Sequence, residues 1–364
     1  MPIKVLVISS YDDAFNAVRP EGELFIGLHR AGVEVEVMTQ GHAAYAQLFR
    51  DAGIKVYDFH PAKTWDPAAV RYIRSVLREG GHQILHLFNK KAVVNGVRAA
   101  RGLPVKVVTY RGFTGHLNWY DPSVYLTHFH PRVDKITCLA DSVRDHVRSN
   151  LLFRPPDFAV TVNKGHDLSW YAGIQPADLS EFELPAGAMV VSCVANARPM
   201  KGIRYLIEAT HFLPEEAPIH FLLIGNGMDK FSDLIGQSPY RDRIHLAGFR
   251  RNALEIVAAC DASVLPSIKG EATPKAALEA LFLGRPLVFT SIAGNKGMAV
   301  HGQTAYIVPP ADPKALAEGL LWMWQHPVER RQMGEKGRAY IAEHFSVARS
   351  VREMKAVYEA LCNK

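Results

Sequence analysis

The sequence has few cysteines, and their placement argues against disulfides and metal sites. Only 4 of the 364 residues are cysteine, and no two have the spacing of a metal-binding or redox motif. Three of them lie in or beside apolar runs, so we expect reduced core thiols in a cytoplasmic protein. The four residues are Cys138, Cys193, Cys260 and Cys362.

Long apolar runs are also lacking. No segment approaches the ~18 uninterrupted apolar residues that are needed to span a bilayer. The N-terminus has one apolar run of strand length and no cleavable signal pattern. We therefore expect a soluble protein that at most contacts a membrane surface.

No stretch of the chain concentrates charge of one sign. The sequence has 42 Lys and Arg against 36 Asp and Glu, a formal net charge of +6. The basic residues are spread among the acidic ones, which argues against nucleic-acid binding. The small positive excess favours anionic partners such as nucleotide diphosphates or phospholipid surfaces.

The length and the alternation of elements predict two tandem doubly wound α/β domains with a cleft between them. A segment rich in Gly, Pro and Asp, residues 165–187, separates the two halves. In the first half we expect strands at 3–8, 33–38, 54–57, 83–87, 105–109, 135–139 and 159–162, and helices at 21–30, 42–52, 67–79, 91–101 and 141–151. In the second half we expect strands at 189–195, 219–224, 244–247, 262–265 and 287–290, and helices at 203–212, 276–283, 314–324, 328–344 and 347–361.

Two carboxylates stand out in the stretch from residue 262 to 290. Glu279 lies in a helix that is apolar on nearly every face, where an ionised group is costly unless a polar partner meets it. Glu271 lies in the preceding loop, at the carboxyl end of a strand, where open parallel sheets bind ligands. Thr273 is expected to cap the helix, with Pro274 in its first turn and Gly284 ending it. The alternative is that Lys269, Lys275 or Arg285 pairs with one carboxylate and water meets the other.

A second candidate site is the loop of residues 196–202, which leads from a strand into a helix. Backbone N–H groups at a helix start attract anions, and Arg198 and Lys201 flank this one. The alternative is two solvated surface cations. Weaker signals are the glycine turn Gly225-Asn226-Gly227 and the segment Gly248-Phe249-Arg250, which can offer backbone groups to a base edge.

In the first half, Tyr110-Arg111-Gly112 ends a strand and precedes a long aromatic segment. His128 and His130 lie in that segment, but no third ligand has suitable spacing, so we expect no metal. The segment could form a lip against an acceptor or a membrane surface, or it could pack on its own domain.

Together these features resemble glycosyltransferase family 4, retaining nucleotide-sugar enzymes of the GT-B fold. The resemblance covers most of the chain and is strongest from residue 163 to 310. Glu271 and Glu279 match the family's Glu-x7-Glu motif. By analogy, Glu279 holds the ribose hydroxyls of the donor and Glu271 contacts the donor sugar, through charge-assisted hydrogen bonds.

The resemblance implies roles for other residues as well. Arg198 and Lys201 would hold the diphosphate, and domain closure would bring Arg111 and the loop from Ser9 to Asp13 over the donor. The other donor-binding positions are Asn196, Gly225, Asn226, Gly227, Phe249, Arg250, Ala272, Thr273 and Pro274, and the acceptor-side positions are Ser10, Tyr11 and His116. The family's hinge motif is matched by Asn163, Gly165 and Asp167.

The implied domains are an acceptor-binding domain, residues 1–164 with a C-terminal helix at 347–364 that crosses back, and a nucleotide-sugar-binding domain, residues 165–346. Three positions depart from the family pattern. Asn196 stands where an Arg is frequent, Tyr110 or Arg111 where many members have His, and Gly297 where a Glu is expected.

The expected activity is retaining hexosyl transfer from a nucleotide diphosphate sugar, without a metal or other cofactor. A UDP-sugar is favoured over GDP- or ADP-sugars. The expected acceptor is a glycan or a lipid-linked molecule in bacterial lipopolysaccharide or polysaccharide synthesis, in the cytoplasm or peripherally at an anionic inner membrane. Two alternatives stay open: a non-hydrolysing sugar-nucleotide epimerase, and a catalytically silent carbohydrate- or nucleotide-binding module.

Overall fold

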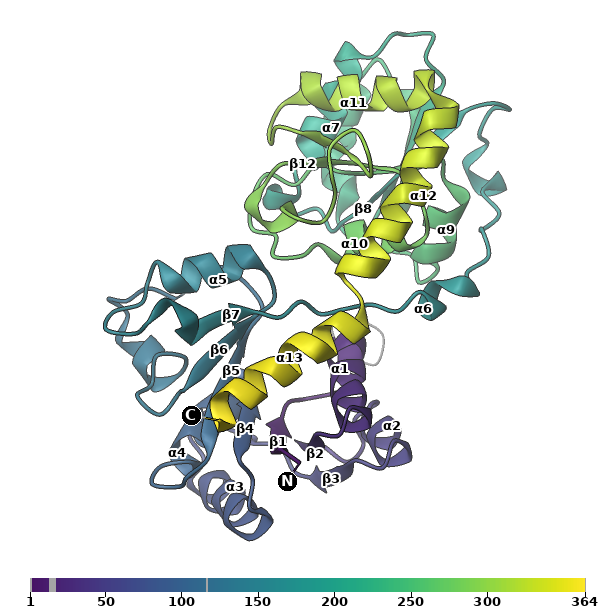
Figure 1. Ribbon diagram of the computed structural model, residues 1–364. Coiled ribbons are helices and arrows are strands. Elements are labelled where there is room, and N and C mark those ends of the chain that lie inside the picture. Colours follow the sequence, from purple (N-terminus) through teal and green to yellow (C-terminus); the bar gives the residue numbers. More distant parts are fainter. Residues whose placement is uncertain (1, 13–17, 116, 364) are drawn as a thin grey trace. The chain divides into compact units, whose positions relative to one another are not determined.

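The computed structural model describes residues 2–12, 18–115 and 117–363. It divides into two compact units (Figure 1). The N-terminal unit consists of Met1–His166 and Phe345–Lys364, and the C-terminal unit of Asp167–His344. Both boundaries lie within two residues of those expected from the sequence, and each unit has its own α/β core.

The N-terminal unit is built on a seven-stranded sheet in the order β3-β2-β1-β4-β5-β6-β7, in which all neighbouring strands are parallel. Helices connect most of the successive strands, as is usual for parallel pairing, while β5 and β6 are joined by a long loop with the 3-10 helix Pro122–Leu126. The strands are β1 (Lys4–Ile8), β2 (Glu34–Thr39), β3 (Lys55–Asp58), β4 (Ile84–Leu87), β5 (Lys106–Arg111), β6 (Lys135–Cys138) and β7 (Ala159–Thr161). The helices are α1 (Val18–Arg30), α2 (Ala46–Asp51), α3 (Pro67–Gly80), α4 (Lys90–Ala99) and α5 (Asp141–Arg148).

The C-terminal unit repeats the same architecture on a six-stranded parallel sheet in the order β10-β9-β8-β11-β12-β13. Its strands are β8 (Met189–Val194), β9 (Ile219–Ile224), β10 (Ile244–Gly248), β11 (Ala262–Leu265), β12 (Leu287–Thr290) and β13 (Tyr306–Val308). Its helices are α6 (Ser169–Ala172), α7 (Ile203–Ala209), α8 (Ser232–Gly236), α9 (Ala253–Ala259), α10 (Lys275–Phe282), α11 (Pro313–Gln325) and α12 (Pro327–His344). Near-continuous apolar runs form the strands because both faces of the sheet are covered.

The last helix, α13 (Val347–Cys362), packs in the N-terminal unit against α1. Lys355 donates a hydrogen bond to the carbonyl of Ala31, 2.8 Å away, at the end of α1. Tyr358 is fully buried, and its hydroxyl lies 2.7 Å from Nδ1 of His86 on β4. Burial lowers the pKa of His86 to about 3, so the imidazole is neutral. The helix is thus part of the core of this unit.

The two chain segments that border the units are hydrogen-bonded to each other. The amide of His166 donates to the carbonyl of Phe345 at 2.7 Å. The hydroxyl of Ser350 accepts from the amide of Gly165 at 2.9 Å and donates to the carbonyl of Asn163 at 2.6 Å. Two residues of the expected hinge motif therefore lie in an ordered backbone junction.

Some expectations need correction. The helix expected at 42–52 begins only at Ala46. The strand β13 was not expected, because it is three residues long and only Val308 among them is buried. The three cysteines expected in the core, Cys138, Cys193 and Cys260, are buried and free. No helix among the described residues is long and apolar enough to cross a membrane.

Candidate functional site

In the C-terminal unit, the loops that follow β8, β11 and β12 meet at the carboxyl edge of the sheet. They approach so closely that two positions require glycine. A Cβ on Gly202 would lie 2.0 Å from the carbonyl oxygen of Pro266, and one on Gly294 would lie 2.0 Å from that of Glu271. The loop after β8 is also tied to the one after β11 by a 2.8 Å hydrogen bond from Ile268 to Met200.

This meeting of loops brings Lys201 and Glu271 together. Nζ of Lys201 lies 2.5 Å from Oε1 of Glu271, and the Ser267 hydroxyl donates to the same oxygen at 2.8 Å. The Lys201 side chain is 20% exposed and that of Glu271 is 9% exposed. No donor among the described residues reaches Oε2 of Glu271, so this carboxylate keeps one oxygen for a further hydrogen bond.

Polar contacts behind Glu271 hold the loop that carries Ser267. The Thr290 hydroxyl donates to the carbonyl of Ser267 at 2.5 Å. The side-chain amide of the buried Asn295 donates to the backbone carbonyl of Thr290 at 2.7 Å. Neither Ser267 nor Asn295 was expected from the sequence. The only available signal for Ser267 was its position at the end of a strand, four residues before Glu271.

Glu279 lies on α10, and its side chain is 15% exposed. Lys275, one helical turn earlier, places its ammonium 3.0 Å from Oε1. The alternative is therefore confirmed for Glu279, whereas the other carboxylate, Glu271, pairs with Lys201 and not with water alone. Burial raises the pKa of Glu279, and Lys275 counteracts this only in part. Its Oε2 has no donor among the described residues.

The start of α10 differs from the sequence expectation. Pro274, not Thr273, occupies the N-cap position, and no side chain of the described residues caps the helix. The Thr273 hydroxyl donates instead to the carbonyl of Ala272 at 2.8 Å. The helix N-terminus therefore directs backbone N–H groups outward, an arrangement that attracts anions. Gly284 follows the helix with φ of 70°, as expected for its end.

The loop after β8 also carries Arg198, which is exposed and whose side chain makes no hydrogen bond or ion pair among the described residues. Oδ1 of Asn196 accepts a 3.1 Å hydrogen bond from the amide of Asn226. The amide of Gly225 donates to the carbonyl of Gly248 at 2.8 Å. The expected donor-binding loops after β8, β9 and β10 are thus adjacent, and Gly227 lies in the same turn.

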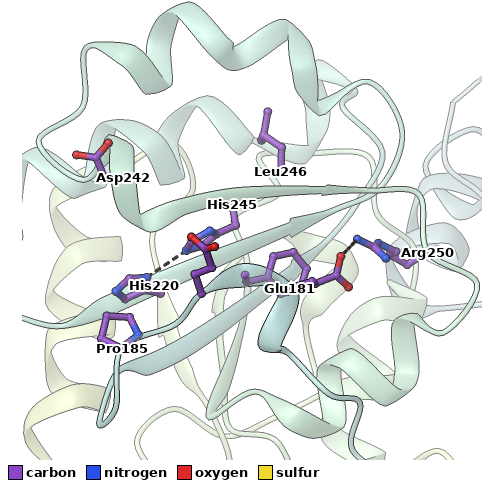
Figure 2. Close-up of a pocket in the computed structure, with 9 residues that line it drawn as sticks. Glu181, Pro185, His220, Asp242, His245, Leu246 and Arg250 are labelled. Carbon is purple, nitrogen blue, oxygen red and sulfur yellow. Dashed lines mark hydrogen bonds and ion pairs between the residues drawn. The ribbon is translucent and has the colours of Figure 1, made fainter.

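Phe249 and Arg250 follow β10 but differ in surroundings. The Phe249 side chain is exposed, whereas Arg250 donates to Glu181 at 2.5 Å and to the carbonyl of Ala247 at 2.8 Å. Figure 2 shows Arg250 directed at Glu181, beside an open depression of about 520 Å³. No contact among the described residues links the Arg250 guanidinium to the Lys201–Glu271 pair. The prediction for this segment therefore stays that its backbone groups, and not the Arg250 side chain, contact the base of the donor.

The same depression contains two stacked imidazoles (Figure 2). His220 and His245, on β9 and β10, have ring nitrogens 3.1 Å apart. Burial and the second imidazole lower the pKa of His220, and burial lowers that of His245. Among the described residues, no group of three or more His, Cys, Asp or Glu side chains gathers as a metal site would require.

In the N-terminal unit, Arg111 ends β5 and its side chain is occupied internally. The guanidinium donates to the carbonyls of Phe113, at 3.0 Å, and Gly115, and stacks 3.8 Å from the Phe113 ring. Burial lowers its pKa. In this conformation Arg111 organises the loop after β5, so its catalytic role stays a prediction that requires these contacts to change.

The acceptor-side residues have unequal surroundings. Ser10 is half-buried at the end of β1, whereas Tyr11 is 0% exposed and packs against Phe49 with ring centroids 4.9 Å apart. This packing weighs against contact between Tyr11 and an acceptor. His116 and Asp13 lie outside the described residues. His128 packs on its own unit through a 3.0 Å contact with Thr109.

A second Lys–Glu pair, in the N-terminal unit, was not expected from the sequence. Nζ of Lys164 lies 2.8 Å from Oε2 of Glu21 and 4.6 Å from the centre of the Tyr110 ring. The Ser9 hydroxyl donates to Oε1 of Glu21 at 2.8 Å. Burial opposes the charge of Lys164, but Glu21 and Tyr110 outweigh it and raise the pKa.

Comparison with known proteins supports the family resemblance. A family model described as Glycosyltransferase Family 4 matches residues 22–170, and one described as Glycosyl transferases group 1 matches residues 175–340. The two matches together cover most of both units.

Two curated relatives illustrate the similarity. The N-acetyl-alpha-D-glucosaminyl L-malate synthase of Bacillus anthracis is 24% identical over 180 residues, which are 49% of this chain and 47% of the relative. The lipopolysaccharide core biosynthesis glycosyltransferase LpsD of Rhizobium meliloti is 24% identical over 205 residues, 52% of this chain and 58% of the relative. The chain thus matches about half the length of these relatives.

Among solved structures, Anabaena Alr3699/HepE in complex with UDP has a TM-score of 0.74 and 16% identity, covering 99% of this chain and 100% of that one. The same protein with UDP-glucose has a TM-score of 0.73 and 17% identity, covering 98% and 100%. At this identity the likeness establishes the two-unit fold.

Proposed function

The chain belongs to glycosyltransferase family 4 and is a glycosyltransferase of the GT-B fold, and from that premise we propose a specific reaction. The protein transfers a hexose from a nucleotide diphosphate sugar, a UDP-sugar in the first place, to an acceptor hydroxyl. The anomeric configuration is retained, and neither a metal nor another cofactor takes part.

The observation that carries this proposal is the open Lys201–Glu271 pair. Glu271 is held by Lys201 and Ser267 through one oxygen and keeps the other for a hydroxyl of the donor sugar. Lys201 places a positive charge beside this carboxylate, and the exposed Arg198 adds a second positive charge to the same loop. A diphosphate that binds there would gain charge-assisted hydrogen bonds and would replace part of the contact between Lys201 and Glu271.

Glu279 has the properties of a binding residue. Its raised pKa shows that the fold does not by itself favour the charged carboxylate. A ribose diol would donate two hydrogen bonds to it and would stabilise the charge in its buried position. We therefore assign Glu279 to the nucleoside and Glu271 to the sugar, as the family motif implies.

The chemical step follows from where the positive charge lies. As the bond between the sugar and the diphosphate breaks, negative charge develops on the leaving group and oxocarbenium character on the sugar. The acceptor hydroxyl oxygen forms the new bond to the anomeric carbon, and its proton leaves with the diphosphate. Arg198 and Lys201 stabilise the leaving diphosphate, and preorganised charge of this kind is worth a few kcal/mol per group. We assign no covalent nucleophile. The acceptor is proposed to bind the N-terminal unit, near Ser10 and the loop after β5.

The properties of the relatives support the choice of substrates. HepE binds UDP and UDP-glucose, which favours a UDP-sugar donor. LpsD acts in lipopolysaccharide core biosynthesis, which favours a glycan or lipid-linked acceptor of a bacterial surface polysaccharide. Such an acceptor would be used at the cytoplasmic face of the inner membrane.

Calorimetry with UDP, GDP and ADP tests the site. UDP is expected to bind most tightly, and Lys201→Ala should weaken its binding by about ten- to a hundredfold, because charge-assisted hydrogen bonds are lost. Arg204→Ala is the matched control, since Arg204 lies three residues away with a side chain that is 70% exposed. Equal loss in both variants, or unchanged affinity in Lys201→Ala, would refute the assignment.

Turnover assays distinguish the reaction from the alternatives. With donor and acceptor, we expect nucleotide release over many turnovers that EDTA does not reduce. Incubation with donor alone should leave the sugar unchanged. An epimerised donor would indicate a sugar-nucleotide epimerase, and binding without turnover across an acceptor panel would indicate a silent binding module.

A further inference from the structure

Large apolar side chains gather on two loops of the N-terminal unit. Single exposed apolar residues are common on protein surfaces, but a group of them indicates an interaction site. One loop follows β5, and the other connects α5 to β7; these three elements are labelled in Figure 1. The group, which we term the aromatic patch, consists of Trp119, Tyr120, Tyr125, Leu126, Leu152 and Phe153, with exposures of 38% to 102%.

Hydrogen bonds join the two loops into one surface. The amide of Trp119 donates to Oδ1 of Asn150 at 3.4 Å, which places the first loop beside the second. The Tyr125 hydroxyl donates to the carbonyl of Trp119 at 2.8 Å, and the rings of Trp119 and Tyr120 meet edge to face at 5.8 Å. The exposed rings are therefore fixed by the protein's own contacts.

Phe153 is the most exposed residue of the aromatic patch and has an unfavourable backbone. It is 102% exposed, and its φ of 59° lies in the left-handed region that residues with a Cβ rarely adopt. The next residue anchors the loop, because Arg154 stacks 4.7 Å from the Phe158 ring and donates to the carbonyl of Pro131 at 3.1 Å. The loop thus holds an apolar tip away from the protein instead of letting it pack.

The charge of the chain is concentrated on the same unit. The N-terminal unit has 25 Lys and Arg against 17 Asp and Glu, a formal +8, whereas the C-terminal unit has 17 against 19, a formal −2. Arg148 and Arg154 flank the apolar tip, and neither has a carboxylate partner among the described residues; each donates to a backbone carbonyl.

We propose that the aromatic patch binds the surface of an anionic phospholipid bilayer. Leu152 and Phe153 enter the boundary between headgroups and acyl chains, and the Trp and Tyr rings lie at the headgroup level that such side chains prefer. Arg148 and Arg154 face the lipid phosphates, and the net charge of the unit adds long-range attraction. The apolar tip with flanking arginines matches a lipid surface better than a polar glycan.

Vesicle flotation with the full chain tests this proposal. Vesicles of phosphatidylcholine alone are compared with vesicles that also contain phosphatidylglycerol. The wild type should bind the anionic vesicles, and high salt should weaken the binding. The double variant Leu152→Ser/Phe153→Ser should bind about tenfold more weakly or worse, because two inserted apolar side chains are lost. The control Phe212→Ser changes an equally apolar residue of the other unit, 55% exposed, and should bind as the wild type does.

Two outcomes overturn the proposal. One is equal vesicle binding by the wild type and the double variant, or no binding by either. The other is self-association of the wild type that the double variant abolishes in light scattering, which would make the patch an interface between copies of the chain. Melting temperature and UDP binding of the double variant should equal those of the wild type, so a failure here is separate from a failure of the donor site.

Discussion

The two units each contain a Lys–Glu pair near the carboxyl ends of their strands, and the pairs differ in one respect. Lys164 and Glu21 are 2.8 Å apart with side-chain exposures of 15% and 7%; Lys201 and Glu271 are 2.5 Å apart with exposures of 20% and 9%. Distance and burial are therefore nearly the same.

The difference lies in how the carboxylate oxygens are used. Both oxygens of Glu21 have donors, Ser9 on one and Lys164 on the other. Glu271 receives its two donors among the described residues, Lys201 and Ser267, on a single oxygen. The first pair is closed and can only support the fold. The second is open and can bind a ligand, so a short distance alone does not identify a functional ion pair.

The largest expected effect comes from breaking the closed pair. Glu21→Ala leaves Lys164 charged in a largely buried place and should lower the free energy of unfolding by about 3–5 kcal/mol, measured by urea denaturation. The double variant Glu21→Met/Lys164→Met should recover most of this loss. A loss below about 1 kcal/mol in Glu21→Ala would show that the pair is not structural.

Breaking the open pair should affect activity more than stability. Lys201→Met is expected to lower kcat/KM with a UDP-sugar about 10²- to 10³-fold, because charge stabilisation of the leaving group is lost. Its free energy of unfolding should change by about 1 kcal/mol or less, since Glu271 keeps Ser267 and can meet water. If the free energy of unfolding fell as much as in Glu21→Ala, the Lys201–Glu271 pair would also be structural and the distinction between the open and the closed pair would be wrong.

Glu279 is expected to favour UDP binding while lowering the stability of the folded protein. Glu279→Gln should weaken UDP binding about tenfold in calorimetry. The raised pKa means that this carboxyl contributes most below its unfolded pKa of 4.5 and loses that contribution as pH rises through the folded value. The variant should therefore melt higher than the wild type at pH 7, with the difference vanishing below pH 4.5. A lower melting temperature at pH 7 would contradict this account.

The smallest expected effect concerns the buried contact between His86 and Tyr358, in which neither side chain is charged. His86 has a folded pKa of about 3, below the ordinary 6.5, so its contribution to stability is complete above pH 6.5 and falls as the pH is lowered toward 3. The loss is up to about 1.4 kcal/mol per pH unit. His86→Phe should be less stable at pH 7.5, since the Tyr358 contact is lost, yet depend less on pH between 7.5 and 5.5 in urea denaturation. Parallel pH profiles would refute this.

Much of the fold was predictable because both sheets are parallel and buried. The strands β9, β11 and β12 have the bounds that their apolar runs predict, since strands covered on both faces read as continuous hydrophobic segments. The start of α10 was predicted wrongly. The Thr273 hydroxyl satisfies a neighbouring carbonyl, a local choice that spacing does not reveal.

The candidate site was predictable in its residue types and not in its contacts. The positions of Glu271 and Glu279, in a loop and a buried helix, follow from the local pattern. The pairing of Glu271 with Lys201, 70 residues away, depends on how the loops after β8 and β11 meet. Arg111 is a second example: its position at the end of a strand was predicted, and its hydrogen bonds to the following loop were not.

The sequence by itself determined two α/β units, reduced cysteines in the core and a family motif, because periodicity and burial are properties of short segments. Only the tertiary structure decided which Lys–Glu pair is open, and that two loops combine into one aromatic patch. The physical reason is that hydrogen-bond saturation and surface exposure depend on groups far apart in the chain, which only the packed loops bring within a few ångströms.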